Sequence, residues 1–183
     1  FPNDNTTYQE EYNTNDNPLQ GIRWNIDYTS KQLPFGQMLA GYQFRHLNHY
    51  GNFIYERKDE ESGIYELIPE FSSEVNLNRM IHAAYVQWNK KIKKWSYASG
   101  VRFEYMNRDF QLQDKANLID STYSYTYFKP FFSGNVSYTS TENLTWKLNF
   151  TQRVERETTF KMNPFPEREH SETLEQGDPT VLP

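Results

Sequence analysis

Residues 135–165 read NVSYTSTENLTWKLNFTQRVERETTFKMNPF, and the first half of this stretch decides the fold class. Four apolar residues occupy the even positions from 144 to 150, and polar residues stand between them. Side chains alternate between the two faces of a strand, so this period of two predicts a strand with one apolar face. Residues 132–138 alternate in the same way before the four-residue turn STEN. The stretch therefore predicts a β-hairpin.

Similar alternation recurs along the chain and predicts an all-β fold, an antiparallel meander of about six strands. It is clearest in residues 22–29 and 95–105, where aromatic and aliphatic residues alternate with polar ones. The expected strands lie near residues 21–30, 37–57, 74–88, 95–113, 122–138 and 144–160.

Two architectures fit such strands: part of a transmembrane β-barrel, or a soluble antiparallel sheet or sandwich. The connections help to choose between them. Short turns are expected near residues 31–36, 89–94 and 139–143, and long loops near 57–73, 107–121 and 161–183. This strict alternation of short and long connections favours the barrel, because tight turns gather at one end of a barrel and long loops at the other.

The barrel interpretation assigns each strand residue to lipid or to the lumen. Its lipid-facing residues are expected to be Ile22, Trp24, Ile26, Trp95, Val101, Phe103, Leu144, Trp146, Leu148 and Phe150. Its lumen-facing residues are expected to be Arg102, Glu104, Lys147, Asn149 and Arg153. Arg102 and Glu104 are spaced for an ion pair on one strand face, a simpler role for them than acid–base catalysis. Residues 1–20 are expected to be a polar loop or tail, 21–160 the β-barrel segment, and 161–183 a truncated extracellular-loop segment.

Composition excludes several other classes. The 183 residues contain no cysteine, so disulfides, thiolate metal sites and a cysteine nucleophile are excluded. A net charge of -5 and an isoelectric point near 5.4 argue against a nucleic-acid partner. No run approaches the roughly 18 apolar residues of a transmembrane helix. Aromatic residues make up 17% of the chain while the mean hydropathy is -0.93, a combination that alternating barrel strands with polar loops produce.

The residues suggest neither catalysis nor metal binding. His46, His49 and Glu56 could be considered as a metal site, but no further ligand falls in phase, so solvated histidines are the simpler interpretation. The sequence has no glycine-rich phosphate loop, HExxH motif or nucleophile elbow. We therefore expect a protein that is not an enzyme and needs no cofactor or metal.

Four stretches together resemble a family, the β-barrel region of the TonB-dependent outer-membrane receptors of Bacteroidetes type. They are IRWNIDYTSKQLPFGQMLAGYQFR from residue 22, IHAAYVQWNKKIKKWSYASGVRFEY from residue 81, YFKPFFSGNVSY with LTWKLNFTQRVER, and RVERETTFKMNPF with EQGDPTVLP. The likeness runs from about residue 22 to residue 183 and lies in the order and spacing of the stretches. Some positions depart from the family pattern, namely Glu157, Met162, Asp178 and Val181.

The resemblance implies location in the bacterial outer membrane and uptake of a nutrient. The partners it implies are outer-membrane lipid, a plug domain, the remaining barrel strands, TonB and an unknown nutrient ligand. The chain is then expected to be a piece of a longer protein. A water-soluble binding module of the periplasm or cell surface is the alternative.

The long loops are the expected place of ligand contact, because strand residues of a barrel are already committed to lipid or lumen. Residues 57–73 and 107–121 combine aromatic residues with acids and amides. The candidate ligand contacts are Tyr65, Phe71 and Phe110.

Overall fold

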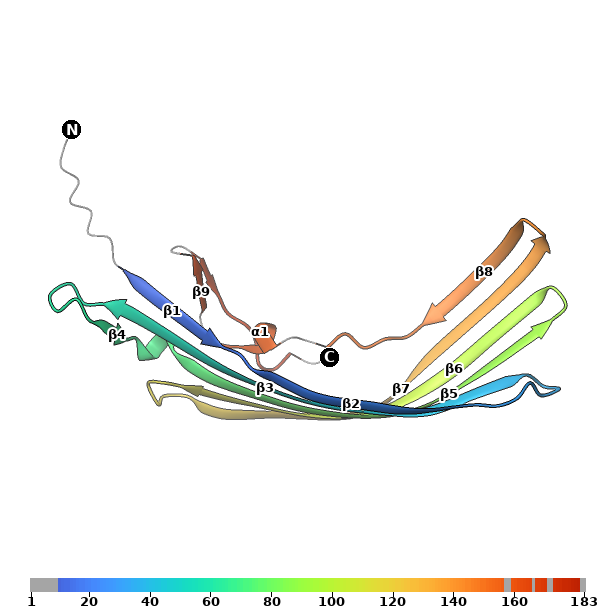
Figure 1. Cartoon of the computed structure of the whole chain (residues 1–183), viewed down its shortest axis with the longest axis horizontal. Coiled ribbons are helices and arrows are strands. Elements are labelled where there is room, and N and C mark those ends of the chain that lie inside the picture. The colour runs from blue at the N-terminus through green and yellow to red at the C-terminus, as the bar shows by residue number, and fades with distance from the viewer. Residues whose placement is uncertain (1–9, 157–158, 166, 171–172, 182–183) are drawn as a thin grey trace, which may run out of the picture.

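The computed structural model describes residues 10–156, 159–165, 167–170 and 173–181, and it shows one strongly curved antiparallel sheet (Figure 1). The strands of this sheet are β1 Glu11–Asp16, β2 Leu19–Thr29, β3 Gln37–Lys58, β4 Tyr65–Leu67, β5 Ser73–Ile92, β6 Trp95–Asp114, β7 Asp120–Thr141 and β8 Leu144–Thr151. A short 3-10 helix, η1 Pro69–Phe71, precedes β5. The C-terminal part adds α1 Thr159–Met162 and a two-stranded sheet of β9 Glu167–His170 and β10 Thr173–Glu175.

The strands follow one another across the sheet, as the meander prediction requires. β1 and β2 both pair with β3, and β3, β5, β6, β7 and β8 then pair in sequence order. β1 and β2 form one interrupted strand, because Pro18 between them has no N–H to give to the ladder. The predicted all-β antiparallel fold is confirmed. Within the described residues, the far edges of β2 and β8 have no strand beside them.

Several predicted boundaries were wrong. Residues 11–16 and 19–20, expected in a polar loop or tail, are strand, whereas residues 1–9 lie outside the described residues. β8 ends at Thr151 rather than near residue 160, and residues 157–158 are not described. β6 continues to Asp114 and β7 begins at Asp120, so the expected long loop at 107–121 is a connection of residues 115–119 only. The long connection after β3 is present.

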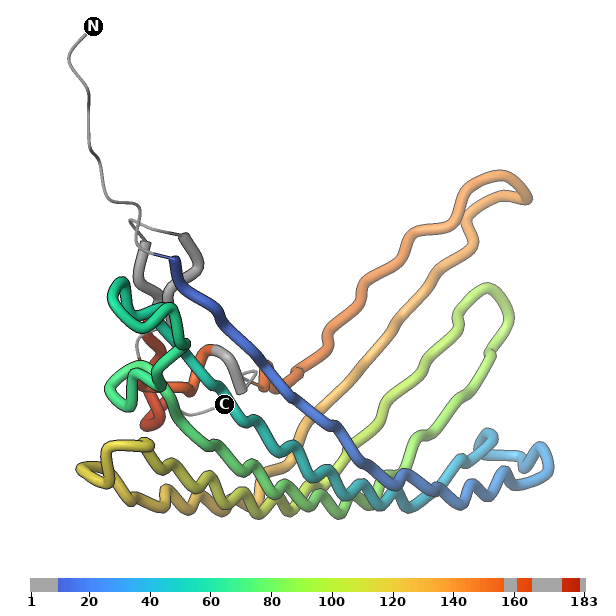
Figure 2. Tube along the Cα trace, turned by 60° about the vertical axis from the view of Figure 1, so that its left-hand side comes forward, coloured from blue at the N-terminus to red at the C-terminus, as the bar shows by residue number. Residues whose placement is uncertain are grey.

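The connections gather at two ends of the sheet (Figure 2). The tips of the hairpins β2–β3, β5–β6 and β7–β8 lie at one end, which we call the turn end. The connections β3–β5 and β6–β7 lie at the opposite end, the loop end, together with the C-terminal segment.

Each half of the sheet has its apolar side chains on a different face. In the turn-end half of β6, Trp95, Phe103 and Tyr105 are exposed on the convex face. From residue 106 the apolar positions change from odd to even, so Met106 and Phe110 are buried on the concave face. β5 changes phase in the same way. The convex face therefore carries an apolar belt only near the turn end, and on β6 this belt spans residues 95–105, close to the roughly 9–11 residues with which a tilted strand crosses a bilayer.

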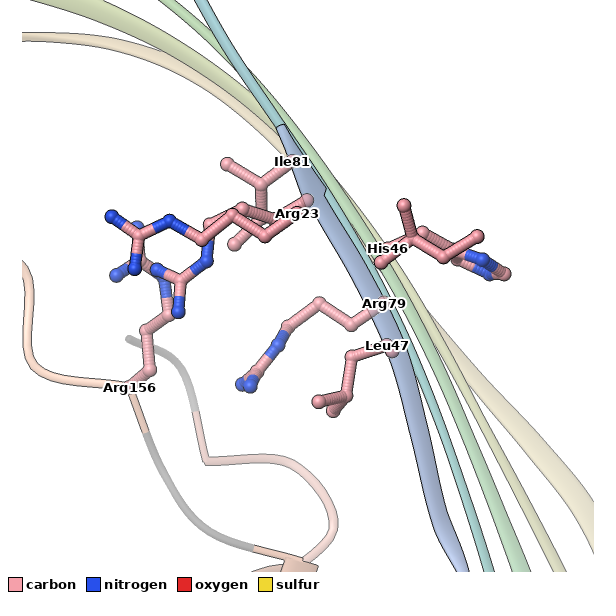
Figure 3. Close-up of a pocket in the computed structure, with 9 residues that line it drawn as sticks. Arg23, His46, Leu47, Arg79, Ile81 and Arg156 are labelled. Carbon is pink, nitrogen blue, oxygen red and sulfur yellow. The ribbon is translucent and has the colours of Figure 1, made fainter. Parts of the chain in front are cut away.

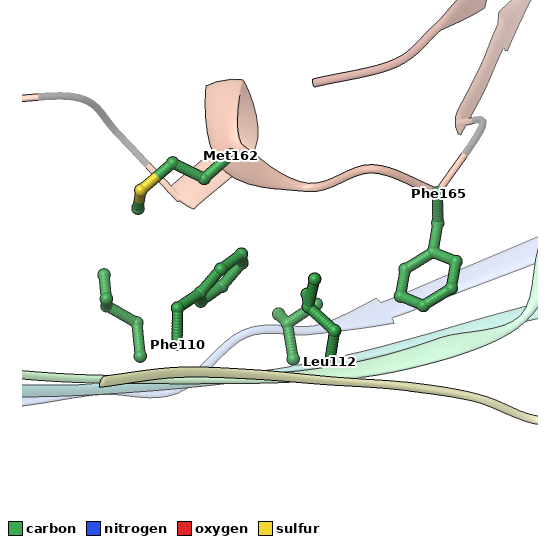
Figure 4. Packing of buried hydrophobic residues seen from close by; sticks show 6 residues of the cluster. Phe110, Leu112, Met162 and Phe165 are labelled. Atoms are coloured by element: carbon green, nitrogen blue, oxygen red, sulfur yellow. The ribbon is translucent and has the colours of Figure 1, made fainter. Parts of the chain in front are cut away.

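The loop-end half builds its core on the concave face (Figure 4). α1 and residues 163–165 lie inside the curve of the sheet, where Met162 and Phe165 cover side chains from β5 and β6. The buried cluster consists of Val75, Leu77, Phe110, Leu112, Met162 and Phe165. Met162 and Phe165, which lie in the segment expected as an extracellular loop, thus pack against the concave face, because the phase change in β5 and β6 provides an apolar surface there. No helix in the described part of the chain has the length and apolar character of a membrane crossing.

Candidate functional site on the concave face

The strand register separates the predicted polar and apolar residues onto opposite faces. Arg102 and Glu104 lie on the concave face, as do Lys147 and Asn149, while Trp146 is 65% exposed on the convex face. The ten residues expected to face lipid all belong to the convex face. Arg153 follows β8 and lines a cavity of about 250 Å³ beside Glu104. The concave face is thus the polar face in the half of the sheet near the turn end.

Glu104 is the centre of a buried ion-pair network. Only 2% of its surface is exposed, and burial of a carboxylate is costly unless partners neutralise it. Its Oε2 accepts hydrogen bonds from Arg102 Nε at 3.2 Å and Nη2 at 3.1 Å, so the predicted Arg102–Glu104 ion pair is confirmed. Its Oε1 accepts from the hydroxyl of Tyr127 and from Arg156. This network joins β6 and β7 to the segment that follows β8.

The network continues across the sheet through Arg102, whose Nη2 also donates to Gln43 Oε1 at 3.1 Å. Gln43 belongs to β3, two strands away from β6. Near the loop end, Arg108 Nη1 contacts Met162 Sδ at 3.0 Å and its Nη2 donates to the carbonyl of Val181 at 3.2 Å. Charged side chains of the concave face therefore hold the chain after β8 against the sheet at two levels.

Next to the Glu104 network lies an arginine-rich cavity of about 360 Å³ (Figure 3). Four arginines from three strands and from the segment after β8 line it: Arg23, Arg45, Arg79 and Arg156. Figure 3 shows Arg23, Arg79 and Arg156 on the same side of the sheet, with His46 pointing away from the other face. Among the described residues, the cavity lining includes Leu47 and Ile81 but no acidic residue. Its electrostatic character is strongly positive.

Sequence reasoning missed this arginine cluster. The alternation of its strand places Arg23 on the polar face. Its proximity to Arg45 and Arg79 could not be predicted, because they lie 22 and 56 positions further along the chain. Only the register brings them together, by placing Arg23 opposite Arg45 and Arg79 opposite Leu47. An arginine on the polar face of each of three successive strands was the one available signal.

The three predicted ligand contacts lie in different environments. Tyr65 is 39% exposed in β4, and its hydroxyl donates to Glu10 Oε1 at 2.5 Å, a contact that raises the pKa of Tyr65. Phe71 is half-buried in η1 and packs edge-on against Tyr55, with ring centroids 5.5 Å apart. Phe110 is in β6 rather than in a loop and has no exposed surface. The structure does not bring these three residues together as one site.

The connection after β3 is a structured one. Asp59 Oδ1 accepts hydrogen bonds from the backbone N–H groups of Ser62 at 2.7 Å and Glu61 at 3.1 Å. The Ser62 amide is the main cause of a lowered pKa at Asp59. His46, considered with His49 and Glu56 as a metal site, instead contacts Asn78 on the neighbouring strand at 3.2 Å. Among the described residues, no group of three or more His, Asp or Glu side chains could hold a metal ion.

Comparisons with known proteins agree with this architecture. The model of the family described as "Outer membrane protein beta-barrel family" matches residues 1–183. Neither the curated proteins nor the solved structures gave a significant match. The family match covers the whole chain. The apolar convex belt and the polar concave face near the turn end agree with it. The chain belongs to the outer membrane protein β-barrel family, whose place is the outer membrane of bacteria.

Proposed function

We propose that this chain is a segment of a TonB-dependent receptor that takes up a nutrient through the outer membrane. In this proposal the protein binds and transports but catalyses no reaction. The sheet supplies part of the barrel wall, with its belt against outer-membrane lipid. The open edges of β2 and β8 fit this role, because further strands would pair with them on barrel closure.

The observation that carries the proposal is the packing of the two C-terminal stretches that resemble the receptor family. These stretches, RVERETTFKMNPF and EQGDPTVLP, meet in the structure: Gly177 N donates to Asn163 O at 2.6 Å, and Asp178 N donates to Lys161 O at 2.9 Å. A Cβ at position 177 would overlap the backbone carbonyl of Lys161, so this close approach requires glycine. The two parts of the signature therefore form one unit, which is held inside the curve of the sheet by Met162 and Arg108.

The remaining partners follow from the size of the barrel. A receptor barrel of this kind has a lumen wide enough to need a plug. In the proposal a plug domain and further strands complete the lumen, and TonB transmits energy to the plug. The unknown nutrient first meets the loop end, where Tyr65 and Phe71 in the connection after β3 are the ligand contacts that we propose.

Uptake by cells that express the full-length receptor tests this function. Cells with TonB should accumulate the nutrient, and cells without TonB should lose that uptake while the receptor still reaches the outer membrane. Uptake that is unchanged without TonB would contradict energy coupling and would indicate a passive channel.

A loop deletion tests the proposed contact region separately. Deleting residues 59–63, the exposed tip of the connection after β3, should weaken ligand binding, whereas deleting 115–119 serves as a comparison at the neighbouring hairpin. Equal binding by the parent protein and the 59–63 deletion would refute the loop assignment and leave the barrel assignment intact.

A further inference from the structure

We propose that the arginine-rich cavity is a binding site for a small multivalent oxyanion of the phosphate or pyrophosphate class. The site consists of Arg23, Arg45, Arg79 and Arg156, which line the cavity of about 360 Å³ on the concave face (Figure 3). This inference concerns what binds inside the curve of the sheet and does not depend on coupling to TonB.

The sheet register forces arginines into opposition. Arg23 of β2 stands directly opposite Arg45 of β3, and Arg79 of β5 stands directly opposite Arg108 of β6. Like charges directly opposite each other on adjacent strands are destabilising. A shift of register by one residue would separate these arginines, but it would also turn Ile22 and Trp24 from the apolar belt onto the polar face. The register is therefore fixed with the arginines opposite each other. Two such pairs beside one cavity indicate that a negative charge belongs between them.

The acids among the described residues do not supply that charge. Glu104, the buried acid beside this cavity, already accepts hydrogen bonds from Arg102, Tyr127 and Arg156. Among the described residues, none of the ion pairs involves Arg23, Arg45 or Arg79. The Nε of Arg156 is also buried and has no hydrogen-bond partner among the described residues. Guanidinium donors thus remain free on several sides of the cavity.

The chemistry of these donors favours phosphate over other ligands. A guanidinium presents a planar fork of N–H donors that matches the oxygens of phosphate or carboxylate in pairs. Four arginines stand against one carboxylate that is already shared, so a single carboxylate ligand would leave most of the positive charge unbalanced. Phosphate and pyrophosphate carry several charges and offer oxygens in more than one direction. Leu47 and Ile81 in the same lining leave room for a short organic part of a phosphate ester.

Calorimetric titration of the detergent-purified full-length protein with sodium pyrophosphate, and separately with inorganic phosphate, tests the site. Arg79→Gln should weaken pyrophosphate binding about tenfold or more, as expected when one charged hydrogen-bond donor is lost. Lys147→Gln makes the same change of charge on the concave face but outside the cavity, and it should change affinity less than about twofold. Absence of binding by both anions, or equal binding by the two variants, would overturn the proposal.

Thermal unfolding gives a second readout that does not rely on heats of binding. Pyrophosphate should raise the unfolding temperature of the parent protein and of Lys147→Gln, because a ligand that binds the folded state stabilises it. It should raise that of Arg79→Gln much less. Without the anion, Arg79→Gln should unfold at the same temperature as the parent or higher, since the variant removes the repulsion with Arg108. A large loss of stability of Arg79→Gln in anion-free buffer would show that the arginine is already paired and would overturn the site.

Discussion

Replacing Glu104 by glutamine should destabilise the protein strongly, because this carboxylate neutralises two arginines on the concave face. The substitution Glu104→Gln turns one acceptor oxygen into an amide donor that faces either Arg102 or the pair of Arg156 and Tyr127. About two hydrogen bonds to a charged group are lost, each contributing about 1.5–3 kcal/mol. The side chains of Arg102 and Arg156 remain 30% and 22% exposed, so water recovers part of this cost. We expect a loss of about 3 kcal/mol in the free energy of unfolding.

Urea titration in detergent micelles, followed by tryptophan fluorescence, measures this loss. The matched control is Glu74→Gln, which removes the same charge from an ion pair with Lys115, where the Glu74 and Lys115 side chains are 36% and 27% exposed. Exposed pairs contribute about 0–1 kcal/mol, so the control should unfold near the parent's midpoint. If the two variants lose the same free energy of unfolding, Glu104 does not hold the network together and the reasoning is wrong.

Three further predictions address packing and the loop end. Phe110→Ala should cost about 3–5 kcal/mol of unfolding free energy in the same urea assay, because the ring is fully buried, and a loss below about 1 kcal/mol would contradict the described core. Gly41→Ala should lower the free energy of unfolding by about 1–3 kcal/mol, since a Cβ there would lie 2.5 Å from the Tyr85 ring. The control Gly134→Ala, where the nearest atom to a Cβ is 4.0 Å away, should be nearly neutral. Similar losses for both variants would contradict this prediction. Asp59 should titrate below its ordinary pKa of 3.8 when followed by carboxyl NMR. The ionised carboxylate stabilises the turn at a pH above the unfolded-state pKa, and this stabilisation is lost as the pH falls through the folded-state pKa. A measured pKa at or above 3.8 would be inconsistent with the turn.

The strands and their faces could be predicted from the sequence where alternation is regular. Trp146 and Lys147 separate onto opposite faces simply because they are neighbours on a strand, so no tertiary information was needed. The expected strand near residues 95–113 matches β6, but the long loop expected at 107–121 was wrong up to residue 114. The polar convex positions Asn107 and Asp109 gave that stretch the composition of a loop. The even positions still carry Met106 and Phe110, and this change of phase marks where the outer surface leaves the apolar belt.

Other features could not be predicted from local pattern. The fold of the C-terminal segment depends on Met162 and Phe165 meeting a surface built by β5 and β6, and no periodicity in residues 161–183 announces that contact. The arginine cavity depends on register between strands far apart in sequence, as the pair of Arg23 and Arg45 shows. Glu104 and Arg102 were found because they lie two residues apart, whereas Arg156 joined them only in the structure.

The convex face near the turn end should meet lipid and the concave face should meet water. Strand β8 offers the most direct measurement of this difference. These 183 residues contain no cysteine, so single cysteines can be placed in turn at residues 144–151. Each can carry a spin label in lipid vesicles, in a full-length protein whose other cysteines, if it has any, are replaced by serine. Collisions with oxygen, which concentrates in lipid, should be frequent at the even positions, and collisions with a water-soluble nickel complex should be frequent at the odd ones. Oxygen and nickel accessibilities that do not alternate, or that alternate with Lys147 on the lipid side, would contradict the account.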